Sequence, residues 1–368
     1  MFRMQIQSKK KCIWYCSAAV SFLLFLLLNL WCDHLVNMQD AQQMAGRWSE
    51  KKDVAQVSCF FSSKAEVTED TIQSFEYSLK NVLQEASITE TSENPSARLW
   101  VDAYSADGKI TLVNGRNTLD ANAIGIGGDF FLFHPLKLIT GSYFSGNDLM
   151  QDYCIIDQDA AWQLFGSNDV VGMTVYIGNV PHIVTGVVRR PQGRMEKAAG
   201  LTSTVVYVSY ETLEAYGTNN GINHYEIVMP NPVDEFAYGK VKEGIGIDEK
   251  NVEIVENSRR YSLPNRIKTI LAFGTRSMNG KAIIYPYWEN LARGYEDIIA
   301  LLTVFMLFLL LYPVVTVIWC FVHWWRHKGW TLKDVWHTGK DKAERAVDRR
   351  REKTVTYPHL TLPTTSRV

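Results

Sequence analysis

The chain has 368 residues, and its 38 basic and 39 acidic side chains nearly cancel to a net charge of -1. These charges are unevenly placed: residues 1–32 carry 4 basic and no acidic groups, residues 33–297 carry 23 basic and 34 acidic groups, and residues 298–368 carry 11 basic and 5 acidic groups. The acidic centre argues against a nucleic-acid-binding body, and 46% hydrophobic residues exclude wholesale disorder. Six cysteines in a chain of this length do not make a disulfide scaffold.

The first predicted element is an uncharged run over residues 12–32, which follows the basic residues 1–11. As a helix it would reach about 31 Å, the thickness of the hydrocarbon core of a bilayer. A cleaved signal peptide is the alternative. The run is longer than a usual signal core, and Trp31, Cys32 and Asp33 make a poor cleavage site, so we favour an uncleaved transmembrane helix.

The next two predicted elements are a strand over residues 55–61 and a helix over residues 69–86. Apolar residues of the second segment repeat at helical spacing, and Thr68 is a suitable N-cap. Residues 98–104 and 109–113 are predicted to be two short strands joined by a hairpin turn at Asp107 and Gly108. The order strand, helix, strand, strand indicates an α+β layer with the helix on one face of a sheet.

The segment 137–188 predicts a strand, a capped helix and a hairpin in close succession. A strand at 153–156 leads to Asp157 as N-cap of the helix AAWQLF, which Gly166 ends. The strand TVYIG then turns at Gly178 and Asn179 into the strand HIVTGVV.

A second uncharged run, residues 298–322, is long enough to span a bilayer with some tilt. Pro313 lies inside it, where a proline usually kinks a membrane helix rather than ending it. Because basic residues precede the first run and follow the second, the positive-inside rule places both termini in the cytoplasm. Residues 33–297 are then extracytoplasmic, and residues 323–368 form a basic cytoplasmic tail.

Aromatic residues flank the second run, and the tail after it is strongly charged. Tyr285, Tyr287 and Trp288 lie just ahead of residue 298 and are predicted to anchor the chain at the level of the lipid headgroups, in preference to forming a ligand cage. Residues 340–352 predict a charged helix whose basic excess rests on anionic lipid. Docking of Leu332, Val335 and Trp336 into an ATPase is the alternative. The last dozen residues show no periodicity and are expected to be disordered.

Here the sequence resembles a known family. The string IIDQDAAWQLFGSNDVVGMTVYIGNVPHIVTGVV is similar to the core signature of the MacB-type periplasmic core domain, found in MacB/FtsX-like ABC transporter permeases. The residues that match its pattern are Gly141, Phe144, Asp148, Leu164, Phe165, Gly166, Asp169, Gly172, Gly186 and Val187. Residues 206–213 resemble the strand and helix that follow the inserted subdomain of that domain, and residues 225–243 resemble its last strand and helix. The resemblance covers roughly residues 37–295.

This resemblance implies an α+β extracytoplasmic domain, with an inserted subdomain, between two transmembrane helices. It also implies a permease-like component that couples a cytoplasmic ABC-type ATPase to a substrate or partner outside the membrane. The usual permease has four spans, whereas this sequence predicts two. A second permease subunit, or further copies of this chain, are therefore expected partners beside the membrane lipid, and no nucleic acid is expected.

Motifs for chemistry are missing from the sequence. It contains no phosphate-binding loop G-x-x-x-x-G-K-[ST], no nucleophile elbow and no H-E-x-x-H zinc helix, so the chain is not predicted to be an enzyme. The sequence nominates no catalytic, cofactor-binding or metal-binding residue. Cys59 and Cys154 are predicted to be either bridged or buried as free thiols.

Two other readings of the two-span layout stay open. A membrane sensor with a ligand-binding outer domain is the main alternative, although only 46 residues follow Val322 to carry a signalling segment. A regulator of polysaccharide chain length would share the layout, but it needs long coiled-coil heptads that the sequence lacks.

Overall fold

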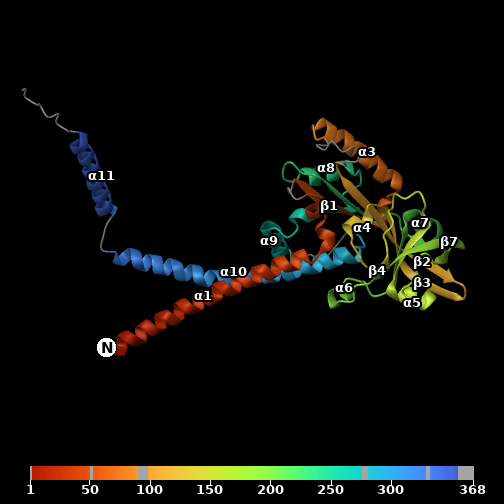
Figure 1. Cartoon of the computed structure of the whole chain (residues 1–368), viewed down its shortest axis with the longest axis horizontal. Coiled ribbons are helices and arrows are strands. Elements are labelled where there is room, and N and C mark those ends of the chain that lie inside the picture. The colour runs from red at the N-terminus through yellow and green to blue at the C-terminus, as the bar shows by residue number, and fades with distance from the viewer. Residues whose placement is uncertain (1, 50–52, 90–97, 276–280, 329–331, 355–368) are drawn as a thin grey trace, which may run out of the picture. The chain divides into compact units, whose positions relative to one another are not determined.

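A computed structural model describes residues 2–49, 53–89, 98–275, 281–328 and 332–354 (Figure 1). The chain forms two compact units: one comprises residues 1–25 and 308–368, and the other comprises residues 26–307. Two long helices, α1 (Phe2–Asn37) and α10 (Tyr287–His327), each contribute residues to both units.

The larger unit is built on one sheet of eleven strands. The strand order is β11-β1-β10-β2-β3-β8-β5-β7-β4, with β6 paired to β2 and β7, and β9 paired to β2. The strands are β1 (Val54–Phe61), β2 (Val101–Asn114), β3 (Asn117–Gly128), β4 (Lys137–Gly141), β5 (Tyr153–Asp157), β6 (Thr174–Ile177), β7 (Val180–Arg189), β8 (Val205–Ser209), β9 (Thr218–Asn219), β10 (His224–Pro230) and β11 (Val252–Glu256).

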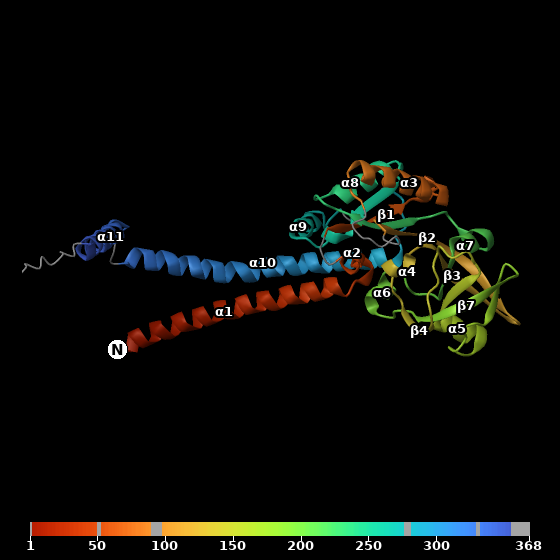
Figure 2. The ribbon, with the colours of Figure 1, turned by 45° about the horizontal axis from the view of Figure 1, so that its top comes forward.

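Helices cover this sheet and connect its strands (Figure 2). The α-helices of the larger unit, besides parts of α1 and α10, are α2 (Met44–Trp48), α3 (Glu69–Glu85), α4 (Phe130–Phe133), α5 (Gln158–Phe165), α6 (Arg194–Ala198), α7 (Tyr210–Tyr216), α8 (Phe236–Gly244) and α9 (Leu263–Leu271). Short 3-10 turns lie at η1 (Asp40–Gln42), η2 (Ser63–Ala65) and η3 (Asn257–Arg259).

The sheet buries apolar residues in two clusters. The larger cluster lies under α3, α5, α7 and α8 and includes Phe75, Leu164, Leu213 and Val241. The smaller cluster is mostly aromatic and includes Met44 of α2, Phe130 and Phe133 of α4, and Trp288 of α10. The first turn of α10, which we call its foot, is therefore part of the core of the sheet domain.

One part of the sheet is inserted between two strands that pair in parallel. Strands β3 and β8 are neighbours, and residues 129–204 between them carry β4 to β7 with α5 and α6. Parallel neighbours need such a crossover connection. The pairings β2-β3, β3-β8, β8-β5, β5-β7, β7-β6 and β6-β2 close a ring of strands around part of the larger cluster.

The predicted strand–helix–hairpin succession is confirmed. Asp157 accepts a hydrogen bond from the Ala160 backbone N–H over 2.8 Å at the start of α5, and Gly166 ends that helix in the left-handed region. Gly178 and Asn179 both have positive φ, 56° and 64°, in the tight turn between β6 and β7. Helix caps and two-residue turns can be predicted from the sequence because each depends on a few neighbouring residues.

The predicted hairpin at Asp107 and Gly108 is wrong. These residues lie inside the long strand β2, and the chain reverses at Gly115, whose φ is 60°. Gly108 serves close packing: a Cβ there would lie 2.4 Å from the Thr218 carbonyl oxygen and 3.0 Å from Leu213 Cδ1. An Asp-Gly pair is a turn signal by local preference, but here the approach of β9 and α7 requires the glycine.

Within the smaller unit, α1 and α10 contact each other through polar and aromatic groups. The hydroxyls of Ser17 and Tyr312 lie 2.7 Å apart, Ser21 donates to the Leu309 carbonyl over 2.8 Å, and the rings of Trp14 and Trp319 meet edge to face. Both helices are long and apolar enough to cross a membrane. Helix α10 continues through Pro313 rather than ending there.

The charged tail contains a helix, as the sequence predicts. It is α11 (Leu332–Thr354), a part of the smaller unit. The expectation of disorder at the end of the chain falls on residues 355–368, which lie outside the described residues.

Candidate functional site

The residues ahead of the second apolar run are partly inside the sheet domain. Trp288 is only 4% exposed, and its ring packs 4.3 Å from that of His134 and 5.8 Å from that of Phe130. The expectation that Trp288 anchors at the lipid headgroups is therefore wrong. Amphipathic rings near a span favour the membrane interface in general, but the aromatic cluster on α4 offers this ring a drier environment.

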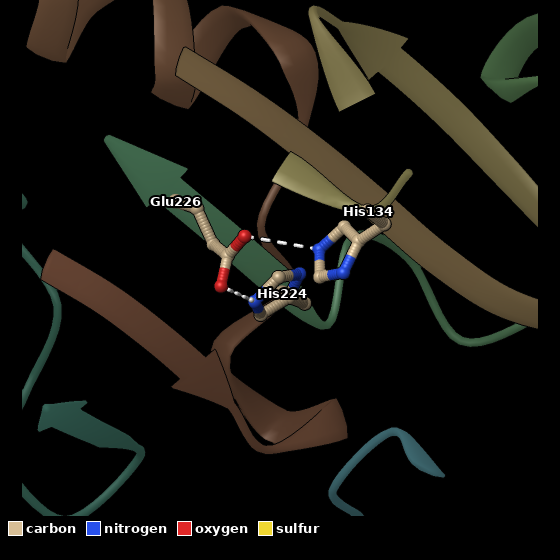
Figure 3. Close-up of side chains that lie close together, drawn as sticks. All are labelled: His134, His224 and Glu226. Carbon is tan, nitrogen blue, oxygen red and sulfur yellow. Dashed lines mark ion pairs between the residues drawn. The ribbon is translucent and has the colours of Figure 1, made fainter. Parts of the chain in front are cut away.

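Beside Trp288 lies a buried triad of His134, His224 and Glu226 (Figure 3). His134 Nε2 lies 2.9 Å from Glu226 Oε2, and His224 Nε2 lies 3.2 Å from Glu226 Oε1. The three side chains are 1% to 4% exposed. One carboxylate thus faces two imidazoles in the interior of the domain.

The register of β10 explains two members of the triad. His224 and Glu226 are two residues apart on one strand and therefore point to the same face of the sheet. Ser58 of β1 is paired with Glu226 and donates a hydrogen bond to its Oε1 over 2.6 Å. Ser105 of β2 is paired with His224, and its Oγ lies 3.3 Å from His224 Nδ1.

The third member, His134, comes from the end of the four-residue helix α4. Its backbone N–H donates to the Phe130 carbonyl and closes the turn. Arg47 of α2 holds the same turn, because its guanidinium donates to the carbonyls of Leu132 and Phe133 over 2.7 and 3.3 Å. The His134 ring lies against the Trp288 ring at an interplanar angle of 43°, and its Nε2 faces Glu226.

Burial and charge act in opposite directions on these groups. Burial by itself would raise the pKa of Glu226, but the two imidazoles outweigh it and hold that pKa well below its ordinary value. Burial lowers the pKa of His134 in spite of the attraction of Glu226.

A chain of hydrogen bonds leads from the triad to the foot of α10. Asn257 of η3 donates to Ser58 Oγ over 2.7 Å, and Ser58 in turn donates to Glu226. Arg260 Nη1 reaches Asn257 Oδ1 at 3.3 Å and Glu289 of α10 at 2.7 Å. The polar path therefore joins β10, β1, η3 and α10 through the interior.

At the α10 end of this path, Arg260 is the central residue. Its side chain is 3% exposed, and it also pairs with Glu296, about two turns further along α10 than Glu289. Arg293 of α10 donates to Glu289 Oε1 over 2.8 Å and flanks the pair. A buried cation held by two carboxylates of one helix fixes that helix against the domain, because loss of either partner would leave a charge uncompensated.

The sequence did not lead us to nominate the triad residues, Arg260 or Glu289 for a functional role. The signal for two of them was present: HYEIVMP places two ionisable residues with strand spacing inside an otherwise apolar run. His134 is 90 residues earlier in chain order than His224, and Arg260 is 29 residues before Glu289. Their meeting is decided by sheet topology, which a single sequence does not display.

The two cysteines in the strands of the sheet domain are free. Cys59 and Cys154 are both buried thiols, which answers the question that the sequence left open. Burial raises the pKa of Cys154 to about 12, so it stays protonated and unreactive at neutral pH.

The sheet domain is flanked by two helices that are long and apolar enough to cross a membrane, and its core includes the first turn of the second helix, an arrangement typical of membrane proteins. The chain belongs to the family of the MacB-like periplasmic core domain, whose model matches residues 38–254, more than half of the chain. It thus belongs among the MacB/FtsX-like ABC transporter permeases, a family of membrane proteins with an extracytoplasmic domain. The resemblance seen in residues 137–188 is confirmed.

Several curated relatives are macrolide export ATP-binding/permease proteins MacB. The chain is 31% identical to the protein of Pasteurella multocida over 98 residues, which are 26% of this chain and 14% of the relative. It is 31% identical to the protein of Chromobacterium violaceum over 96 residues, again 26% and 14%. The match to the protein of Neisseria gonorrhoeae is 36% over 80 residues, 21% of this chain and 12% of the relative. The matched part is thus a small share of these relatives.

Two solved structures are similar to the sheet domain. The periplasmic region of MacB from Actinobacillus actinomycetemcomitans matches with a TM-score of 0.37 and 19% identity, over 58% of this chain and 92% of that one. The extracellular domain of the noncanonical ABC-type transporter YknZ from Gram-positive bacteria matches with a TM-score of 0.35 and 18% identity, over 54% of this chain and 99% of that one.

Proposed function

We propose that this protein is a membrane-anchored permease component that couples a cytoplasmic ABC-type ATPase to a substrate or partner outside the membrane. The family membership supports the permease part of this proposal. The observation that carries the coupling part is the buried attachment of α10 to the sheet domain through Arg260, Glu289 and Glu296. A helix that moves in the membrane and is held in this way would move the sheet with it.

The segment that follows α1 is also attached to the sheet domain, close to the start of α10. Tyr261, next to Arg260, donates from its hydroxyl to Gln39 Oε1 over 2.5 Å and to the Ala292 carbonyl over 3.3 Å. Gln39 follows the end of α1, and its side-chain amide donates back to the Leu35 carbonyl. One tyrosine therefore contacts α10 and the segment that directly follows α1, which supports transmission of motion from either helix.

The proposed topology places residues 1–11 and 323–368 in the cytoplasm and residues 33–297 outside. The charge asymmetry supports it, since the basic residues concentrate at the two ends of the chain. Helix α9 supports the position of the membrane surface that this topology implies. Its Leu263, Ile267 and Leu271 repeat every four residues and are 60%, 46% and 82% exposed. This apolar stripe begins two residues after Tyr261 and is well suited to lie in the headgroup region.

The partners we propose are lipid, an ATPase, and either a second permease subunit or further copies of this chain. Many large apolar side chains of α1 and α10 are exposed, among them Leu27, Leu30, Phe308 and Val317 at 53% to 68%. In a bilayer these residues contact acyl chains or the helices of another subunit.

The proposal is tested by isolating the tagged full-length protein from its native membrane in a mild detergent and identifying the chains that accompany it. We expect an ABC-type ATPase in near-stoichiometric amount. The positive control is an established permease that retains its ATPase in the same detergent, and an unrelated two-span protein controls for nonspecific capture. Recovery of the protein alone, while the positive control keeps its ATPase, would overturn the proposal and favour the sensor alternative.

A further inference from the structure

The triad of His134, His224 and Glu226 has the composition and spacing of a metal site. Its ligand atoms, two imidazole nitrogens and a carboxylate oxygen, all lie within 4.8 Å of one another. Two histidines and one glutamate are a ligand set that Zn²⁺ takes in proteins, with a fourth position left to water. Metal–ligand bonds of about 2.0–2.1 Å in a tetrahedron place neighbouring ligand atoms about 3.3 Å apart. The observed separations of 2.9 and 3.2 Å, each from one imidazole nitrogen to a different oxygen of Glu226, are close to this value.

A second observation points to a ligand at this place. His134 Nε2, His224 Nε2 and Glu226 Oε2 are buried atoms that make no hydrogen bond of acceptable geometry with any described residue, although they lie at ion-pair distance from one another. Buried polar atoms are normally hydrogen-bonded, and exceptions call for an explanation. Three such atoms that converge on one point are explained by a cation between them.

The surroundings supply the outer contacts that metal ligands usually have. Ser105 Oγ lies 3.3 Å from Nδ1 of His224, the ring nitrogen away from the cluster, and Ser58 donates to Glu226 Oε1. Such contacts orient the ligating atoms of imidazoles and carboxylates. The charged groups of Arg47 in α2 and of Arg260, directly after η3, interact electrostatically with Glu226 but donate their hydrogen bonds to other groups. Figure 3 shows both rings presenting Nε2 to the carboxylate.

We propose that His134, His224 and Glu226 bind a single Zn²⁺ ion in the interior of the extracytoplasmic domain. The ion would join the end of α4 to β10, next to Trp288 at the foot of α10. This site is independent of the ATPase partner. Because the site lies on the polar path to Arg260, the bound ion would stabilise the part of the sheet domain to which α10 is attached.

The test uses the full-length protein in detergent with Cys12 and Cys16 replaced by serine. These exposed thiols lie four residues apart on α1, and thiolates at such spacing are potential zinc ligands that would confuse the count. The protein is stripped with a chelator under mildly destabilising conditions, incubated with zinc chloride, and passed over a desalting column. We expect about one zinc ion per chain by elemental analysis, and a rise in the unfolding midpoint with added zinc.

The variants H134Q and H224Q are each expected to retain less than about a tenth of an ion per chain and to lose the zinc-dependent rise in midpoint. The matched control is H182Q, because His182 is also a buried histidine of the sheet domain but hydrogen-bonds to Thr212 and Val180. It is expected to bind zinc like the parent. If a histidine variant does not fold, the isosteric E226Q takes its place.

Two results would overturn the proposal. One is a parent protein that retains no zinc after incubation and shows no change in midpoint. The other is zinc binding that survives in H134Q, H224Q and E226Q alike, which would place the metal elsewhere on the chain.

Discussion

Arg260 and Glu289 form a two-pronged ion pair in the interior of the protein. Nη1 and Nη2 of the guanidinium lie 2.7 Å from the two carboxylate oxygens, and the side chains are 3% and 1% exposed. Arg260 belongs to the turn after β11, whereas Glu289 belongs to the first turn of α10. This pair is therefore the point at which a membrane helix is fixed to the sheet by charge.

We expect E289Q to lower the free energy of unfolding by about 2–3 kcal/mol, because it leaves Arg260 with only Glu296 to balance a buried charge. Thermal unfolding of the full-length protein in detergent measures the change. Replacing Arg260 together with both of its carboxylate partners, as in R260M/E289M/E296Q, should restore most of the loss, since these buried charges are then removed together.

The exposed pair of Lys242 and Glu249, 2.8 Å apart, is the matched control for this experiment. E249Q should leave the unfolding midpoint unchanged, because solvent screens that pair. Equal effects of E289Q and E249Q would contradict the role assigned to the buried pair.

A second prediction concerns pH and the carboxyl groups of Glu76 and Asp102. Burial, and then repulsion by Asp102, raise the pKa of Glu76 to about 8, above an ordinary value of 4.5. The folded state therefore binds the proton more tightly than the unfolded state, and this contribution to stability is full below pH 4.5 and is lost as the pH rises through 8.

The variant E76Q mimics the protonated side chain and should flatten this dependence. We expect it to match the parent near pH 4.5 and to exceed it by about 1–2 kcal/mol near pH 8.5, a range discounted for partial exposure. Unfolding midpoints measured across this pH interval provide the check. Parallel pH profiles of variant and parent would show that Glu76 titrates normally.

A third prediction separates two glycines by what surrounds them. A Cβ at Gly108 would lie 2.4 Å from the backbone oxygen of Thr218, so G108A should destabilise the protein by about 2–3 kcal/mol through displacement of β9 or α7. No atom of the described residues lies within 4 Å of a Cβ added at Gly46 in α2, and G46A should be neutral or stabilising by up to about 1 kcal/mol. Chemical denaturation of both variants tests the contrast, and a neutral G108A would mean that the strand can shift without cost.

A fourth prediction places α9 at the lipid surface. A polarity-sensitive fluorophore attached at L271C, with the other exposed cysteines replaced by serine, should shift its emission to shorter wavelength when the full-length protein is moved from detergent-free amphipol into lipid nanodiscs. The control label is at Y77C, since Tyr77 is 72% exposed on α3, and it should show no shift. Equal emission from both labels would remove α9 from the membrane surface.

Local sequence signals predicted much of the fold. The caps of α5, the turn at Gly178 and Asn179, and the amphipathic helix after Thr68 depend on residues close together in the chain, so a single sequence displays them. The resemblance to the family rests on the same local features, and it led to the correct class of protein.

The errors have one physical origin. Asp107 and Gly108 carry a turn signal, and Trp288 carries an interface signal, but both are overruled by contacts from distant parts of the chain. Propensities of a few tenths of a kcal/mol yield to the burial of a large ring or to the close approach of a neighbouring backbone.

The amino-acid sequence alone determined the two apolar helices, the α+β character of the domain between them and the family, because hydrophobic length and short-range turn chemistry decide these features. The tertiary structure alone decided where the buried charges meet. His134 reaches Glu226, and Arg260 reaches Glu289, only because β10 lies between β1 and β2 and the foot of α10 closes over that face. Such pairs are set by strand order and register, which depend on the packing of the whole domain.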